Sequence, residues 1–353
     1  MKANAEERGT ILNSYERLFS RLENKPVDRP PNLNILISFA AKYSNVPFSK
    51  FCLDSKSMVE ANLICHEDFG IDAVTTLSDP YAETEDFGAI IEYPYNSNPI
   101  SRNLFLQDYS DIQKLKTREI GESNRMLNRV RTVEMYKERV KGQCPIIGLI
   151  AGPLVQAVCL RGMNQTFIDL IEAPNFIAEV IEVCTVQAIS FAKAQMLAGA
   201  DIIALGEAPS SFVGGDIYRR MILPCEKRIV DEVHKYGGKV KLHTCGNSIN
   251  ILRDVLTTGA DIIDIDWMVD YKKAIQISNG KASINGNVDP VGVMLNGTEI
   301  DVENAVFKCL DCSDSKNIIS AGCEIPAATN PLNIKAFSEA IKKRYPIQIE
   351  HLF

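Results

Sequence analysis

ADIIALG at residues 200–206, IYRRMILPCEKRIVDEVHKYGG at 217–238 and KVKLHTC at 239–245 read as strand, helix and strand. The two short runs are apolar and partly β-branched. The longer run is amphipathic and ends in a glycine pair, which is the usual C-terminal stop of a helix. Strands that alternate with helices favour a parallel sheet, because a crossover helix is what joins parallel neighbours.

The same alternation extends in both directions along the chain. Eight candidate strands follow, at 32–36, 71–77, 145–151, 200–206, 239–245, 260–266, 281–287 and 316–322. Eight such units in 353 residues favour a closed (β/α)₈ TIM barrel over an open doubly wound sheet. We therefore predict one domain over 1–353, in which 1–30 is an N-terminal helical extension. A long segment at 80–144, which we call the excursion, interrupts the alternation of strands and helices after the second predicted strand.

The composition of the chain limits the kinds of binding partner and the cellular location that we expect. The net charge is −7 with no long basic stripe, so we expect no nucleic-acid partner. We find no apolar run of the roughly 18 residues that a membrane helix needs, and the start, MKANAEERGT, has no apolar core of a secretory signal. The ten cysteines are scattered, which suits free thiols in a reducing compartment better than a disulfide framework. We expect a cytoplasmic protein.

A candidate metal site lies at two of the strand ends. His243 and Cys245 are two residues apart on a strand, so both side chains point to one face. Cys323 comes just past the eighth strand, and the ends of all barrel strands surround one mouth. A His-x-Cys pair alone is weak evidence, but with the third residue the set predicts a zinc site. Three mixed N and S ligands with an open fourth position are typical of catalytic zinc.

Other polar side chains stand at the same predicted mouth. We predict catalytic roles for three carboxylates, Glu207, Asp79 and Asp289, and cofactor contacts for Tyr81, Asn287 and Trp267, although a core or rim role is about equally expected for Tyr81 and Trp267. Glu207 could fill the open zinc position or act as an acid or base, or simply hydrogen-bond the following turn. Cys309 and Cys312 form a C-x-x-C pair with no second Cys or His pair nearby, so we interpret them as structural.

Five segments carry a family resemblance, namely VTTLSDPYAETEDFGA (74–89), GPLVQAVCLRG (152–162), HTCGNS (243–248), INGNVDP (284–290) and SAGCEIPAATNP (320–331). Together they resemble the uroporphyrinogen decarboxylase superfamily, and within it the corrinoid methyltransferase branch. The zinc signature of that branch falls here on His243, Cys245 and Cys323.

The resemblance implies a zinc-dependent methyltransferase. Zinc lowers the pKa of a bound thiol, and the thiolate takes a methyl group from a methylated corrinoid, or the reverse. The chain has no Asp-x-His-x-x-Gly module, so we expect the corrinoid on a separate corrinoid-binding protein. The second substrate would be a small thiol or methylated small molecule. Glu207 would cap the zinc between substrates and stay ionised beside its charge.

Two alternatives remain open. Decarboxylation of a tetrapyrrole would need cations for the substrate carboxylates, and the stretch PPNLNILISFAAKYSN at 30–45 has no arginine after Arg29. A non-catalytic zinc-binding barrel would be favoured by four protein ligands, whereas an open three-ligand site would favour the enzyme.

Overall fold

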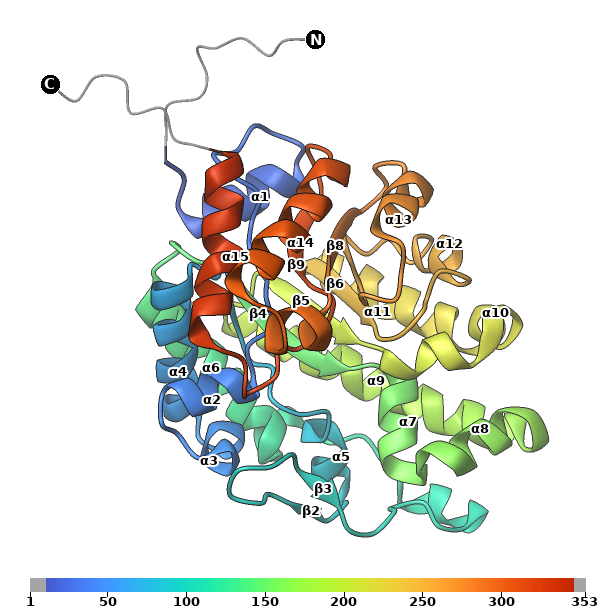
Figure 1. Ribbon diagram of the computed structural model, residues 1–353. Helices are drawn as coiled ribbons and strands as arrows, with labels where there is room; N and C mark the ends of the chain where they lie inside the picture. The colour runs from blue at the N-terminus through green and yellow to red at the C-terminus, as the bar shows by residue number, and fades with distance from the viewer. Residues whose placement is uncertain (1–10, 346–353) are drawn as a thin grey trace, which may run out of the picture.

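The computed structural model describes residues 11–345 and contains one curled sheet of parallel strands (Figure 1). The strand order is β1-β4-β5-β6-β7-β8-β9. The bounds are β1 Val74–Thr75, β4 Ile146–Ala151, β5 Ile202–Gly206, β6 Lys239–Thr244, β7 Ile262–Ile265, β8 Ser283–Val288 and β9 Ile318–Ala321. Seven of the eight predicted strands are therefore present, and the prediction of an α/β fold with a parallel sheet is confirmed.

The first predicted strand, residues 32–36, is wrong as a strand. Only Asn32 forms a parallel bridge, to Ile319, and its carbonyl oxygen accepts a hydrogen bond from the backbone N–H of Asp72 at 2.8 Å. The segment thus touches both edges of the seven-stranded sheet. Prolines 30 and 31 offer no N–H to extend the pairing backwards, and the Asn34 side chain takes the backbone N–H of Ala321 at 2.6 Å.

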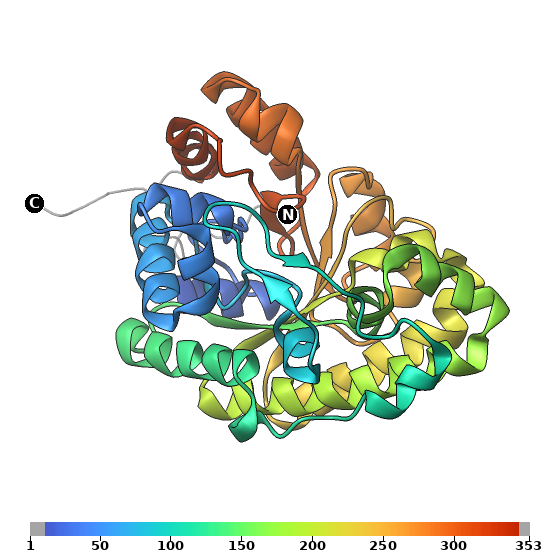
Figure 2. The ribbon, with the colours of Figure 1, turned by 90° about the horizontal axis from the view of Figure 1, so that it is seen from below.

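Helices cover the outer face of the sheet (Figures 1 and 2). The longest, α9, begins at Pro174 and ends at Ala198, and is followed by Gly199, whose φ of 118° suits glycine. The α-helices outside the excursion are α1 Ser14–Leu22, α2 Ser38–Tyr43, α3 Phe48–Leu53, α4 Ser55–Phe69, α7 Pro153–Arg161, α8 Met163–Glu172, α9 Pro174–Ala198, α10 Gly214–Ile217, α11 Leu223–Lys235, α12 Leu252–Val255, α13 Tyr271–Ser278, α14 Glu299–Cys312 and α15 Pro331–Arg344. Helix α1 is the predicted N-terminal helix, and residues 1–10 of that extension lie outside the described residues.

Short helical turns follow several strands. The 3₁₀ turn η4 (Ala208–Phe212) comes after β5, the π-helix η5 (Tyr218–Ile222) leads into α11, and the π-helix η6 (Pro290–Leu295) comes after β8. Because these turns stand at the carboxyl ends of strands or just beyond, they shape the same rim of the sheet.

The excursion at 80–144 contains a hairpin and helices. Its elements are α5 Ala82–Phe87, β2 Ile91–Glu92, β3 Ile100–Ser101, η2 Tyr109–Lys114, η3 Ile120–Glu122 and α6 Arg125–Val140. The antiparallel β2–β3 hairpin lies on the same side of the molecule as α5 and α7, which follow β1 and β4 (Figures 1 and 2). The hairpin is therefore placed near the carboxyl ends of the strands, where the candidate site lies.

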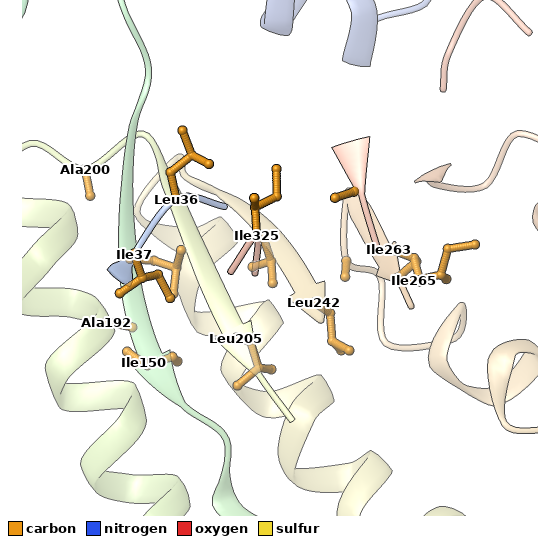
Figure 3. Packing of buried hydrophobic residues seen from close by; sticks show 14 of the residues in the cluster. Leu36, Ile37, Ile150, Ala192, Ala200, Leu205, Leu242, Ile263, Ile265 and Ile325 are labelled. Carbon is orange, nitrogen blue, oxygen red and sulfur yellow. The ribbon is translucent and has the colours of Figure 1, made fainter. Parts of the chain in front are cut away.

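Buried aliphatic side chains from the strands and the surrounding helices form the core. Figure 3 shows side chains of β4, β5, β6 and β7 together with those of Leu36, Ile37 and Ile325. Helix α9 is long and apolar enough to meet the criteria for a membrane span, contrary to our expectation, but half of its most apolar window is buried. It contacts β4, α7 and α11, so its apolar surface is explained by packing in the core.

Candidate metal centre

Three side chains from two strand ends meet at one point. His243 lies on β6, Cys245 follows that strand, and Cys323 follows β9. The His243 Nε2 atom is 3.0 Å from Cys245 Sγ and 3.9 Å from Cys323 Sγ, and the two sulfur atoms are 3.8 Å apart. All three residues are half-buried. The structure brings together residues that are about 80 positions apart, as the sequence predicted.

The sulfur–sulfur separation suits a tetrahedral metal ion, while the two nitrogen–sulfur separations, 3.0 and 3.9 Å, lie below and above the tetrahedral value. Zinc bonds of ~2.3 Å to sulfur and ~2.0 Å to nitrogen at tetrahedral angles put two sulfurs about 3.8 Å apart, and a sulfur and a nitrogen about 3.5 Å apart. The observed sulfur–sulfur distance is 3.8 Å. Within residues 11–345 this is the only group of three or more His, Cys, Asp or Glu side chains close enough to share an ion.

Charges around the cluster are strongly coupled. Burial lowers the pKa of His243, but the neighbouring Asp264 carboxylate outweighs burial and raises that pKa to about 10. A hydrogen bond shared between the thiols lowers the pKa of Cys323 and raises that of Cys245. Without a metal ion these shifts favour a thiolate on Cys323 but a protonated Cys245 and a protonated His243, so binding of a metal ion by all three would release protons.

One carboxylate beside the cluster was not among the predicted site residues. Asp266 follows β7, is 7% exposed, and accepts the backbone N–H of Gly246 on one oxygen at 2.7 Å. Its other oxygen is buried without a hydrogen-bond partner. Its position two residues after Asp264 on a strand end was visible in the sequence, but which strand-end acid would face Cys245 depends on the sheet register.

Glu207 does not have the predicted environment. Its carboxylate is fully buried and accepts the backbone N–H of Leu154 at 2.8 Å, at the start of α7. In the sheet register Gly206 lies opposite His243, so Glu207 emerges on the other face of the sheet. Burial, and then repulsion by Glu226, raise its pKa well above the usual value. The expectations that Glu207 caps the metal and is held ionised there are corrected.

Glu226 of α11 shares this buried pocket and leads to a prediction on pH. Burial raises its pKa to about 7, while a hydrogen bond from Tyr218 opposes the shift. The folded state then holds the proton more tightly than the unfolded state, so this group lowers stability as pH rises from about 4.5 to about 7. We expect Glu226→Gln to remove this part of the decline, as measured by urea unfolding at pH 5 and pH 7.

The matched control for this prediction is Glu60→Gln, because Glu60 is exposed on α4. It should keep the pH dependence of the parent protein. An identical pH dependence in the parent and in Glu226→Gln would contradict the assignment of a raised pKa to Glu226.

The other two predicted carboxylates have structural partners. Asp79 is buried and lies 2.8 Å from Arg125 and 3.3 Å from Arg129, both on α6. Burial raises its pKa, but the two arginines outweigh burial and the net pKa is below the usual value. Asp289 accepts the backbone N–H groups of Val291 and Gly292, each at 2.8 Å, and so caps η6. These contacts hold the excursion and the rim against the sheet. They do not test the catalytic roles that we predicted for Asp79 and Asp289.

The predicted cofactor contacts are at the rim, with different degrees of exposure. Trp267 is 45% exposed after β7, and its backbone packs closely on Gly322, the neighbour of Cys323. Tyr81 is half-buried at the start of α5. Asn287 donates to the carbonyl oxygens of Asp266 and Val269 at 3.0 and 2.6 Å, so its amide N–H groups are used to hold the β7–α13 loop.

A cavity of about 660 Å³ lies between α2 and the loop that joins β2 to β3, and none of the three candidate ligands is in its lining. Ser38 on its wall donates to the Glu324 carboxylate at 2.6 Å, and Glu324 directly follows Cys323. Lys42 is the one cation in its lining, together with the amide side chains of Asn45 and Asn96. The cavity is large enough for a small organic molecule.

The fold and the three-residue centre define an α/β enzyme of the kind in which strand ends carry the chemistry. The profile of the family "Uroporphyrinogen decarboxylase (URO-D)" matches residues 13–344, so the chain belongs to that family. It is 30% identical to the methylcobamide:CoM methyltransferase MtbA of Methanosarcina mazei, over 94% of this chain and 98% of that protein. It is 24% identical to a uroporphyrinogen decarboxylase of Coxiella burnetii, over 93% of this chain and 94% of that protein.

Solved structures agree with the fold. A methyltransferase from Methanosarcina mazei superposes with a TM-score of 0.83 at 20% sequence identity, covering 95% of this chain and 99% of that one. A B12-independent methionine synthase from a Shewanella species superposes with a TM-score of 0.54 at 14% identity, over 82% and 88% of the two chains. The resemblance to the uroporphyrinogen decarboxylase family predicted from the sequence is confirmed.

Proposed function

We propose that this protein is a zinc-dependent methyltransferase that moves a methyl group between a corrinoid and a small thiol or methylated substrate. The observation that carries the proposal is the arrangement of His243, Cys245 and Cys323, with sulfur atoms 3.8 Å apart at the carboxyl ends of parallel strands. Relatives named as methylcobamide:CoM methyltransferases support it over nearly the whole chain.

The three side chains would hold the zinc ion, and each has a defined part. His243 supplies Nε2, while Cys245 and Cys323 supply thiolates that make the site soft enough for another sulfur ligand. When bound, zinc would lower the pKa of a substrate thiol or polarise a methyl donor. Asp266 accepts the N–H of Gly246, next to Cys245, on one oxygen and has one buried oxygen free of partners, so we propose it as a further carboxylate near the site.

In the thiol direction, the substrate sulfur would form a bond to the methyl carbon of the methylated corrinoid. The cobalt–carbon bond would break with its electron pair remaining on cobalt, and the thiol proton would leave to solvent. The reverse reaction uses the same atoms. We propose that a separate corrinoid-binding protein presents the corrinoid in the cytoplasm, and that Tyr81, Trp267 and Asn287 line its approach.

The proposal also takes the curled sheet to be a closed eight-stranded barrel of one domain, completed by residues 32–36. The bridges of Asn32 to β9 on one side and to Asp72 on the other support this closure. A closed barrel gathers all strand ends around one mouth, which would place the cavity between α2 and the hairpin beside the metal ligands.

Decarboxylation of a tetrapyrrole is the second candidate, since decarboxylases are among the relatives. It is disfavoured because the only arginine at the start of the corresponding stretch is already paired. The Arg29 guanidinium lies 2.6 Å from the Asp72 carboxylate, and residues 30–45 contain no arginine, so this stretch offers no unpaired arginine to substrate carboxylates.

A methyl-transfer assay tests the proposed function directly. Methylcobalamin, with a panel of small thiols and with methoxylated or methylamine donors, should change its visible spectrum in the presence of the zinc-loaded protein. We expect turnover with at least one partner. Turnover of uroporphyrinogen, with no transfer from any methyl compound, would favour decarboxylation, and zinc binding without either reaction would favour a non-catalytic zinc barrel.

A further inference from the structure

We infer that Asp264, held by Lys241 and Asn285, is a positioning residue that fixes the imidazole of His243 for metal binding. This inference rests on the proposed zinc site and adds residues that do not touch the metal. It gives a role to the Asp264 carboxylate, a charged group inside the sheet that is not one of the predicted ligands.

The sheet register places the residues in one row. His243 on β6 pairs with Asp264 on β7, and Asp264 pairs with Asn285 on β8. Residues opposite one another in neighbouring strands point to the same face, and Lys241 joins them because it is two residues before His243. Three adjacent strands therefore direct four polar side chains to one side of the sheet.

Contacts within the row restrain the Asp264 carboxylate on both oxygens. Asn285 Nδ2 donates to Oδ1 at 2.5 Å, and Lys241 forms an ion pair with Oδ2. The same Oδ2 atom is 3.0 Å from Nδ1 of His243. The far nitrogen of that ring, Nε2, is 3.0 Å from Cys245 Sγ. The ring is thus held between a carboxylate and the sulfur cluster.

Burying the charges of Lys241 and Asp264 costs free energy. A functional role would explain why these charged residues are inside the sheet. Lys241 and Asp264 are 4% and 1% exposed, and Asn285 is fully buried. A buried ion pair is often no more stabilising than apolar residues of the same size. A carboxylate on the outer nitrogen of a ligating histidine does have a known physical effect, because it fixes the tautomer and the orientation of the ring.

The Asp264 carboxylate determines which ring nitrogen of His243 would carry the proton. The Nδ1 atom of His243 lies 3.0 Å from Asp264 Oδ2 as an ion-pair contact, outside hydrogen-bond geometry. With a metal bound, an Nδ1–H directed at this carboxylate would leave the lone pair of Nε2 to face the ion between the two sulfurs. An asparagine at 264 could instead donate its own N–H to Nδ1, which would place the ring proton on Nε2 and block the metal. Lys241 has no contact with the sulfur atoms and acts through the carboxylate alone.

The test is the zinc affinity of Asp264→Asn, measured by competition with a chromophoric chelator. We expect binding about 10- to 100-fold weaker than in the parent. Cobalt(II) loaded in place of zinc should show an altered visible spectrum, because the spectrum reports the geometry and donor set around the ion. Lys241→Met should weaken zinc binding in the same direction but less.

Asp261→Asn is the matched control. Asp261, which directly precedes β7, also lies between a lysine and a histidine. It is 2.9 Å from both Lys239 Nζ on β6 and His234 Nε2 on α11, at the amino ends of the strands. This variant should keep the zinc affinity and cobalt spectrum of the parent.

The outcomes separate this inference from the proposed function. A parent protein that binds no zinc would overturn the metal site itself. A parent that binds zinc, with equal affinity and an equal cobalt spectrum in Asp264→Asn, would overturn the positioning role alone. If Asp264→Asn does not fold, Lys241→Met and Asn285→Ser decide the question. Weaker zinc binding in both supports the role, and unchanged binding overturns it.

Discussion

Cys245→Ser and Cys323→Ser are each expected to lose zinc and methyl-transfer activity together. A serine hydroxyl stays protonated near neutral pH, so each substitution removes one thiolate charge and one soft ligand from a three-residue site. Substitutions around a metal ligand already cost up to about 100-fold in affinity, so the loss of a ligand should cost more than that. Metal analysis after gel filtration and the methylcobalamin assay measure the two effects.

Cys309→Ser is the control for these variants. Cys309 is a buried thiol on α14 with Cys312 near it, so it tests whether any cysteine substitution disturbs the protein. We expect its zinc content and activity to match the parent. The metal assignment would fall if Cys245→Ser and Cys323→Ser retained one zinc per chain, whatever their activity.

Gly152→Ala is expected to cause a large loss of stability. A Cβ on Gly152 would lie 1.3 Å from the Glu207 Oε2 atom and 2.9 Å from the carbonyl oxygen of Gly206. The carboxylate cannot move away cheaply, because its other oxygen is held by the N–H of Leu154 in a fully buried site. Overpacking together with a broken buried hydrogen bond should lower the free energy of unfolding by about 3 kcal/mol or more.

Urea unfolding measures this effect, and two further variants define its origin. Gly121→Ala should be close to neutral, since a Cβ there meets nothing within 4 Å. In a Glu207→Ala background, Gly152→Ala should cost at least about 1 kcal/mol less than in the parent, because the clashing carboxylate is gone. An equal cost in both backgrounds would show that Glu207 is not the group that excludes a side chain at 152.

The sequence by itself was enough to predict the parallel sheet and the meeting of His243, Cys245 and Cys323. Seven strands were predicted because strand-forming runs and amphipathic helices alternate with clear stop signals, and both features are local. His243 and Cys245 could be assigned to one face because the two-residue repeat of a strand is also local. The link to Cys323 needed only the rule that the ends of parallel strands meet at one edge.

Tertiary structure alone decided the rest. Residues 32–36 have a strand-like composition, yet two prolines and the Asn34 side chain replace most of the pairing. Glu207 stands at a strand end like a ligand, but the register between β5 and β6 turns it toward α7. The register between β6 and β7 sets Asp264 against His243. A shift of one residue would exchange these faces, and no local pattern fixes that choice. It follows from how whole strands and helices pack together, which is why the positioning residues emerged only in three dimensions.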